Sequence, residues 1–458
     1  MITIRKNQQL KMHCITIEDL VPKEHFLRKV DEHVDFSFIY DEVKELYSTK
    51  TGRPSIDPVV LVKYLLVGFL YGIPSERRIE QEIQVNTAYR WFLGLDIDEK
   101  VPDHSTISQL RHRKQIGANL FRRFFEHILA DCIDKNLVDG KLILTDSTHV
   151  KANASKKSEI KIQVEKQAVA YWDRLDKYEE EERQKLESEG KIKPKRKRSK
   201  AKKKPEMVSK TVSTSDPEAG RLNRPGKPEG MHYLDHQSID AKNGIIVDVT
   251  VTAGNVSDCV PYLDCIEKVK EIIDIEATAV DSGYDTSLIH KEMEENGITI
   301  FTPEKNTSDT SKTEYKRDDF SYDQEVDEFT CPNEKKLKLQ RLQRNESSIT
   351  REYKADTKDC ESCPYRKKCL APSQKYRRIQ VNIFEEIVRR HHENDGSEDY
   401  KEALKKRQIL SEGSFAVQKR AHNLKQILRY GLEAAETHCL LSAIALNLKR
   451  MLKQVVYA

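Results

Sequence analysis

The spacing of apolar residues changes twice along the chain, and it predicts helices, then strands, then helices again. Before about residue 135, apolar residues recur at helical spacing, and the run from Val59 to Leu70 is apolar nearly all round, which is typical of a buried helix. Asp57 and Pro58 supply an N-cap and a proline at the first helical position. We therefore expect a helical region over residues 1–135.

Short apolar runs bounded by turn residues follow in residues 136–303. Asn243-Gly244 is a strong hairpin signal between two of these runs. The expected strands cover 142–144, 232–240, 245–251, 277–280 and 298–301, and the expected helices cover 260–273 and 287–296. This order predicts an α/β fold in which helices cover a mixed sheet.

The other segments are more polar. An insertion at 156–210 begins with a predicted helix over 156–186 and contains the block Lys191–Lys204, with ten basic residues and no acidic one. Such a block repels itself, so we expect it to be disordered when free and to attract phosphates, with a solvated linker as the alternative. Residues 304–399 suggest irregular structure without a hydrophobic core. Residues 400–458 predict helices that complete the sheet region, with Leu440–Leu452 packed against it.

Composition narrows the class of protein. The 458 residues suffice for two to four domains, and 34% of them are charged against 37% hydrophobic, with a net charge of +4. The N-terminus lacks the apolar core of a signal peptide, and the run Val59–Ile73 contains Lys63 and is too short to span a bilayer. We therefore expect a cytoplasmic protein with no membrane partner.

Two predicted strands each end in an aspartate, Asp146 and Asp281. If the strands are neighbours, the two carboxylates meet at one end of the sheet, where they repel each other unless a cation lies between them. Oxygen ligands favour Mg²⁺ or Mn²⁺, and a site with two such ions suits phosphoryl transfer. The pair therefore predicts a metal site.

A third acid is expected from the last helical region. Glu412 lies on a predicted helix that also carries Lys419, two helical turns later and therefore on the same face. A cation at that position would lie where a phosphate backbone runs. Glu433 and Glu436 compete with Glu412 for this role.

Nine cysteines in such a chain suggest thiols or metal ligands in place of disulfides. Cys331, Cys360, Cys363 and Cys369 include one C-x-x-C pair and have the spacing of a structural Zn²⁺ site, and metal binding would explain how a segment without a core folds. An iron–sulfur cluster and four reduced thiols are the alternatives.

Basic residues indicate nucleic acid as a partner. The short helices before residue 135 are compatible with a helix-turn-helix arrangement and equally with a plain helical domain. The candidate DNA-binding residues are Arg111, Arg113, Lys151, Arg196, Lys197, Arg198, Arg407 and Lys419.

Several motifs together resemble the DDE-class transposases of bacterial insertion sequences, most of all the group of insertion sequence eleven-eighty-two. The motifs are Gly52–Ser55, Pro102–Thr106, Thr145–Ser155, Ser215–Ala219, Val280–Asp285, Glu412 with Phe415 and Lys419, and Ala445–Arg450. The resemblance covers nearly the whole chain. It implies a ribonuclease-H-like core with Asp146, Asp281 and Glu412 as ligands of two Mg²⁺ or Mn²⁺ ions.

The resemblance also implies a reaction. A transposase of this kind binds the terminal inverted repeats of its element, cuts the ends and joins the 3′ ends to target DNA, as a dimer on paired DNA ends. A DNA-binding protein that no longer cuts, and a ribonuclease-H-like nuclease without strand transfer, are the alternatives. Two positions depart from the family pattern. The Arg expected about four residues before the Glu is Gln408, with Arg407 one residue further away, and no Tyr stands close upstream of the Glu, since Tyr400 is more distant.

Overall fold

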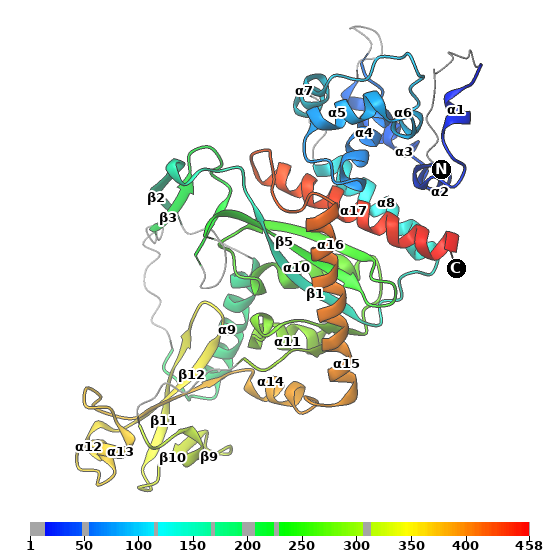
Figure 1. The fold of residues 1–458 in the computed structure, drawn as a ribbon. Helices are drawn as coiled ribbons and strands as arrows, with labels where there is room; N and C mark the ends of the chain where they lie inside the picture. Colours follow the sequence, from blue (N-terminus) through cyan, green and yellow to red (C-terminus); the bar gives the residue numbers. More distant parts are fainter. Residues whose placement is uncertain are drawn as a thin grey trace, which may run out of the picture.

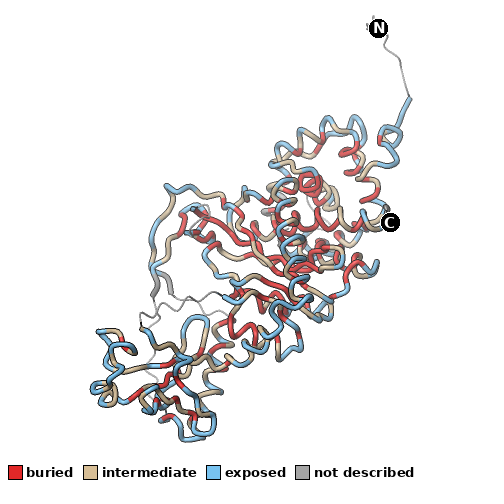
Figure 2. Tube along the Cα trace, turned by 60° about the horizontal axis from the view of Figure 1, so that its bottom comes forward, coloured by how far each residue is buried: buried red, intermediate tan, exposed pale blue. Residues whose placement is uncertain are grey.

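The computed structural model describes residues 14–47, 55–113, 118–165, 170–194, 207–223, 229–305 and 313–457. Figure 1 shows three parts: a helical part formed by the first third of the chain, a mixed sheet in the middle, and a smaller sheet at the opposite end from the first helices. Buried residues form one group in the helical part and around the mixed sheet, and a second group that extends from the helices beside the mixed sheet into the smaller sheet (Figure 2).

The first part is helical, as the apolar spacing predicts. Its helices are α1 (Ile17–Leu20), α2 (Phe26–His33), α3 (Phe38–Val43), α4 (Pro58–Leu70), α5 (Glu76–Val85), α6 (Thr87–Leu93), α7 (His104–Arg113) and α8 (Ala118–Asp134), with a 3₁₀ turn η1 (Lys44–Leu46). The Asp57 side chain accepts the N–H of Val59 at 2.7 Å and caps α4, whose residues are buried nearly all round. No helix in the described ranges has both the length and the apolar character needed to cross a membrane.

The mixed sheet has the order β4–β5–β1–β7–β8, with β6 also paired to β5. Its strands are β1 (Ile143–Lys151), β4 (Gly220–Leu222), β5 (Gly230–Asp240), β6 (Ile246–Ala253), β7 (Ala277–Ala279) and β8 (Thr299–Phe301). β5 runs antiparallel to β1 and β6, whereas β7 and β8 run parallel to β1. Helix α10 (Cys259–Lys270) connects β6 to β7, and α11 (Ser287–Glu295) connects β7 to β8. The predicted mixed α/β architecture is therefore confirmed.

The central strand is longer than its apolar run predicts. The sequence predicts a strand that ends at Asp146, but β1 continues to Lys151. The whole of β1 pairs with β5, because backbone hydrogen bonds form whatever the polarity of the side chains. Its parallel neighbour β7 pairs only with Ile143 and Leu144. Asp146 thus lies within β1 but just beyond the end of β7.

The helix predicted over residues 156–186 forms only in part. A 3₁₀ turn η2 (Lys156–Ser158) leads into β2 (Glu159–Glu165), which pairs with β3 (Met207–Ser213) in a separate two-stranded sheet. Ile160, Ile162 and Val164 alternate with charged or polar residues, and this strand period outweighs the helical one. The helix itself is α9 (Ala170–Ser188).

The irregular structure predicted for residues 304–399 is wrong for most of that range. After a 3₁₀ turn η4 (Arg317–Asp319), strands β9 (Ser321–Asp323), β10 (Glu328–Thr330), β11 (Lys336–Arg344), β12 (Ile349–Ala355) and β13 (Arg378–Asn382) form an antiparallel sheet in chain order, and α12 (Thr357–Glu361) and α13 (Arg366–Cys369) follow β12. This segment also has a core, contrary to expectation, because Leu337, Leu339 and Leu342 alternate with charged residues and pack near Phe329 and Tyr353.

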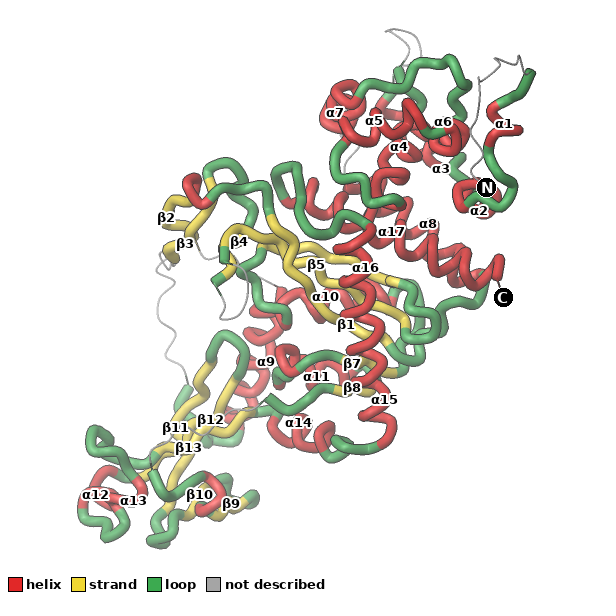
Figure 3. Tube along the Cα trace, in the orientation of Figure 1, coloured by secondary structure: helices red, strands yellow, loops and turns green. Residues whose placement is uncertain are grey.

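The last part of the chain returns to the mixed sheet through helices. These are α14 (Glu385–His392), α15 (Glu398–Arg407), a π-helical turn η5 (Gln408–Glu412), α16 (Gly413–Ala421) and α17 (Leu432–Tyr457). Figure 3 shows α15 and α16 as one long rod that crosses the sheet. Helix α17 packs against α4, α8 and β6, which confirms that Leu440–Leu452 pack on the sheet.

Three polar residues near the end of α17 hold separate parts of the fold together. Asn447 is fully buried, accepts the N–H of Ile246 at 2.9 Å and donates to the carbonyl of the same residue at 2.8 Å. Lys449 donates to the carbonyl of Leu70 at the end of α4. Arg450 donates to the carbonyl of Gly244 and to Oγ of Ser414 in α16. This explains the motif Ala445–Arg450 as a structural one.

We predict that Asn447→Leu lowers the free energy of unfolding by about 2 kcal/mol, because it leaves the N–H and the carbonyl of Ile246 buried without their partners. Chemical denaturation followed by circular dichroism measures the change. The exposed Asn394 is the matched control, and Asn394→Leu should leave the free energy of unfolding within about 0.5 kcal/mol of the original. Equal stability of the two variants would contradict the role given to Asn447.

Candidate active site

Asp146 is a strongly perturbed acid at the centre of the sheet. Its side chain is 16% exposed, Oδ1 accepts the N–H of Ser147 at 2.8 Å, and Oδ2 lies 3.1 Å from Nη1 of Arg407. Burial raises the pKa of Asp146 to about 6; Arg407 opposes this rise, and the negative charges of Asp281 and Asp258 add to it. A cation near Asp146 would relieve both the burial of its charge and the repulsion.

Asp281 reaches the same place from the neighbouring strand. It follows β7 and caps the 3₁₀ turn η3 (Ser282–Tyr284), where its Oδ1 accepts the N–H of Gly283 at 2.7 Å. In the parallel pairing Leu144 lies opposite Ala279, and continuing this register by two residues places Asp146 beside Asp281. The structure therefore brings together the two aspartates that the sequence singles out.

A third carboxylate at this site, Asp258, is not predicted from the sequence. It stands at the start of α10 and accepts a hydrogen bond from Oγ of Ser147 at 2.8 Å. The signal in the sequence is weak, because an aspartate before a helix is also an ordinary N-cap residue. Its charge reaches Asp146, so the acidic site contains residues from β1, from the end of β7 and from the start of α10.

Tyr284 lies beneath these acids. It is 1% exposed, and its hydroxyl has no hydrogen-bond partner within the described residues. Burial raises the pKa of Tyr284 far above its ordinary value, and the charges of Asp258, Asp146 and Asp281 raise it further. The tyrosine therefore stays neutral beside the acids.

Arg407 and Glu412 stand at the two ends of the π-helical turn η5. A π turn closes with bonds from residue i to i+5, so it holds one residue more than an α turn. Residues i and i+5 of a π turn therefore lie on the same side of the helix, as residues i and i+4 do in an α-helix. The extra residue in the turn matches the one-residue displacement of the Arg from its expected position, and Arg407 contacts Asp146.

Glu412 is less closely placed than the two aspartates. Its turn η5 packs against β1 and β5, but the residue is exposed, and none of the hydrogen bonds or ion pairs among the described residues involves its carboxylate. The competing Glu436 pairs with Arg122 of α8 at 2.6 Å and so connects two helices. Glu433 is exposed in the first turn of α17.

Helix α16 contacts the two central strands through polar side chains. Nζ of Lys419 donates to Oγ1 of Thr148 on β1 at 2.5 Å. The amide groups of Gln418 and Gln237 are buried and exchange hydrogen bonds at 2.8 and 3.1 Å. Lys419 is thus fixed two residues along β1 from Asp146, on the same side of the strand.

The predicted DNA-binding residues have different surroundings. Lys151 is exposed at the end of β1. Arg111 is buried and paired with Glu76 of α5, so its guanidinium connects two helices and does not lie on a solvated basic face as expected; burial lowers its pKa to about 10. The side chain of Arg113 lies outside the described residues, as do Arg196, Lys197 and Arg198.

The four predicted cysteine ligands lie close together beside the small sheet, after β10 and in or between α12 and α13, and all are half-buried. Sγ of Cys331 accepts the N–H of Lys335 at 3.3 Å. Burial raises the pKa of Cys360 and of Cys369, and the neighbouring cysteines add to the rise in each case. Two groups of three ligand atoms within 4.8 Å of one another occur in the described residues, and neither contains a cysteine.

The acidic site fits a hard divalent ion. Asp146, Asp281 and Asp258 supply only oxygen donors, which Mg²⁺ and Mn²⁺ prefer, and burial together with the charges of the other two raises the pKa of Asp146. These three acids do not form one of the groups of described residues whose ligand atoms all lie within 4.8 Å of one another, so their side chains would have to move closer together to share one ion. Arg407 already supplies one positive charge to Asp146.

Two segments of the chain are similar to known protein families. A family model described as a transposase domain matches residues 15–113, and another described as a transposase DDE domain matches residues 330–452. No curated protein matches the chain. Among solved structures, the cryo-EM structure of a piggyBac transposase synaptic complex with hairpin DNA is similar over 95% of this chain and 76% of that one, with 8% identity and a TM-score of 0.39.

These matches place a transposase domain and a transposase DDE domain in two separate segments of the chain. A DDE domain implies dependence on a divalent metal ion. The second match contains Glu412, whereas Asp146 and Asp281 lie between the two matched segments.

We predict that deletion of Ile409, which is 60% exposed within η5, lowers the free energy of unfolding by about 1 kcal/mol or less. The deletion turns the π turn into an α turn and keeps Arg407 and Glu412 on one face. Thermal unfolding followed by circular dichroism provides the measurement.

Deletion of the exposed Ala416 in the regular helix α16 is the matched control. It rotates Gln418 and Lys419 away from β5 and β1, so we expect a loss of about 3 kcal/mol or more. Similar losses from both deletions would show that the π turn does not accommodate an extra residue.

Proposed function

We propose that this chain is a DDE-class transposase that cuts the DNA ends of its insertion sequence and joins the 3′ ends to target DNA at a site formed by Asp146, Asp281 and Glu412. The observation that carries the proposal is the position of Asp146 beside Asp281 on parallel strands, within a chain that contains a transposase DDE domain. The motifs favour the group of insertion sequence eleven-eighty-two.

The strand order supports a ribonuclease-H-like core. In the order β6–β5–β1–β7–β8, three antiparallel strands are followed by two parallel ones, and β1 is the central strand. In such a sheet, residues at the carboxyl ends of adjacent parallel strands meet, and this is where Asp281 lies beside Asp146.

The domains that we propose follow from this core. Residues 136–303 and 400–458 form it, with insertions at 156–210 and 304–399, and residues 1–135 form a DNA-binding domain. The contacts of Asn447 with β6 support the assignment of the last helices to the core. The DNA partners are the terminal inverted repeats and the target, and we propose that two copies of the chain assemble on paired ends.

The residues of the site prepare it for phosphoryl transfer. Asp146 and Asp281, with Glu412, would hold two Mg²⁺ or Mn²⁺ ions, which activate the attacking water or 3′ hydroxyl and stabilise the leaving oxygen when bound. Arg407 opposes the rise in the pKa of Asp146, so this carboxylate is largely ionised at neutral pH despite its burial. Lys419 places a positive charge close to the acids, where it would contact a DNA phosphate.

We predict that Asp146→Asn and Asp281→Asn each reduce cleavage of inverted-repeat DNA with Mg²⁺ by about a thousandfold or more, while DNA binding and the circular dichroism spectrum stay unchanged. Glu412→Gln should have a similar effect. Glu433→Gln is the control for the third acid and should cut at the original rate.

The other possible results of this assay distinguish between the alternative functions. A protein that binds the repeats but never cuts would be a DNA-binding protein, and one that cuts without joining ends would be a nuclease. Normal cleavage by Asp146→Asn would disprove the proposed site, and loss of cleavage in Glu433→Gln alone would move the third acid to α17.

We also propose that Cys331, Cys360, Cys363 and Cys369 bind one structural Zn²⁺ ion, which their shared position beside the small sheet supports. Replacing Cys360 and Cys363 together with Ser should remove about one equivalent of zinc from the purified protein, measured by elemental analysis. The buried Cys132, changed to Ser, is the control and should leave the zinc content unchanged. Iron with sulfide in place of zinc, or no metal at all, would contradict the zinc assignment.

A further inference from the structure

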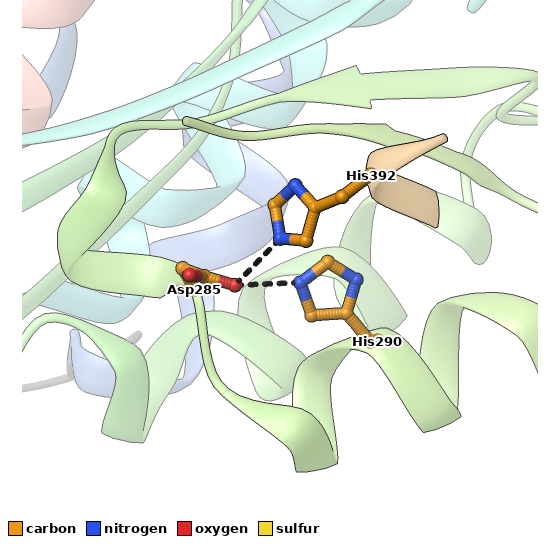
Figure 4. Close-up of side chains that lie close together, drawn as sticks. All are labelled: Asp285, His290 and His392. Atoms are coloured by element: carbon orange, nitrogen blue, oxygen red, sulfur yellow. Dashed lines mark hydrogen bonds and ion pairs between the residues drawn. The ribbon is translucent and has the colours of Figure 1, made fainter. Parts of the chain in front are cut away.

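A second group of ligating side chains shares no residue with the acidic site. Asp285, His290 and His392 place one oxygen and two ring nitrogens within 4.8 Å of one another (Figure 4). Asp285 follows η3, His290 belongs to α11, and His392 is the last residue of α14, so three separate elements converge.

The spacing of the ligand atoms suits a small transition-metal ion. Oδ1 of Asp285 lies 2.9 Å from Nε2 of His290 and 3.3 Å from Nε2 of His392. Two ligands bound at about 2.0 Å in a tetrahedral arrangement lie roughly 3.3 Å apart, so these atoms need to move very little to bind one ion. Two imidazoles with one carboxylate favour Zn²⁺ and similar ions over Mg²⁺.

The other polar atom of each side chain is already fixed. Nδ1 of His392 lies 2.9 Å from Oδ2 of Asp395, Nδ1 of His290 lies 2.8 Å from Nδ1 of His391, and Oδ2 of Asp285 accepts the N–H of Lys305 at 2.7 Å. Such partners orient metal ligands and set the tautomer of each imidazole.

The three side chains are also largely buried, which restricts their movement. His290 is completely buried, and the side chains of Asp285 and His392 are 8% and 14% exposed. The other compact group, Glu80, Asp103 and His104, contains only one imidazole and is only half-buried, and there Asp103 accepts the N–H of Ser105 at the start of α7.

We propose that Asp285, His290 and His392 form a binding site for one Zn²⁺ ion, with a water molecule as the fourth ligand. Bound at this point, the ion connects the turn after Asp281 to the end of α14, which precedes the helix that carries Arg407. Its role is structural, and the site is separate from the acidic one and from the four cysteines. The proposal does not depend on the DNA reaction.

Co²⁺ is the probe that distinguishes this site from the cysteines. The full-length protein with Cys360→Ser and Cys363→Ser is stripped of metal with a chelator and titrated with Co²⁺. We expect about one bound ion per chain, with visible absorption typical of nitrogen and oxygen ligands and without thiolate-to-cobalt charge transfer. Adding His290→Gln and His392→Gln should remove that ion, and Zn²⁺ should displace it from the unaltered site.

Controls separate ligation from folding. His33 on α2 is half-buried and remote, so His33→Gln in the same background should retain the ion. The single change His392→Gln, at the more accessible ligand, should weaken Co²⁺ binding at least about tenfold while the metal-free circular dichroism spectrum stays unchanged. Unchanged binding in the double histidine variant, or absence of a thiolate-free Co²⁺ site before that change, would overturn the proposal.

Discussion

The carboxylates of Asp146, Asp258 and Asp281 lie close together in a partly buried site, where their negative charges repel one another. Each acid belongs to a different element: Asp146 to β1, Asp281 to the turn after β7 and Asp258 to the start of α10. The buried Tyr284 stays neutral beside them, and Arg407 supplies a single compensating charge. The result is an acid with a raised pKa at the centre of a rigid sheet, which is the electrostatic condition for binding a divalent cation.

That rigidity is provided by segments far apart in the chain. Helix α17 lies between the helical part and the sheet, and hydrogen bonds hold both its beginning and its later turns. The backbone N–H groups of Gly431 and Leu432 are bound by the carboxylates of Asp216 and Glu218, which favourably face the positive end of the helix. The motif Ser215–Ala219 is therefore structural in the same sense as Ala445–Arg450: one anchors the beginning of α17, and the other connects its later turns to α4, β6 and α16.

A feature of the structure can be predicted from the sequence when the residues that determine it lie close together in the chain. The strands of the mixed sheet and the pairing of Asp146 with Asp281 are predictable because each apolar run and its aspartate are contiguous. The small sheet is missed because single leucines such as Leu337 and Leu339 alternate with lysines, and this pattern also suits a solvated segment. Asp258 is missed because its role depends on Ser147, more than a hundred residues away. The π turn at Gln408–Glu412 is indicated in the sequence only by the spacing between the Arg and Glu412, which is one residue longer than the family pattern.

The position of the histidine group follows from the topology of the insertion at 304–399. The chain leaves the core after β8 at Lys305, whose N–H binds Asp285, and it returns through α14, which carries His391 and His392. Departure and return therefore meet at one buried point beside η3. The small sheet shares one hydrophobic core with α9, α10 and α11, so the insertion packs directly on the helices of the mixed sheet. The histidine group lies at the junction between this shared core and the segment that continues through α15 to Arg407.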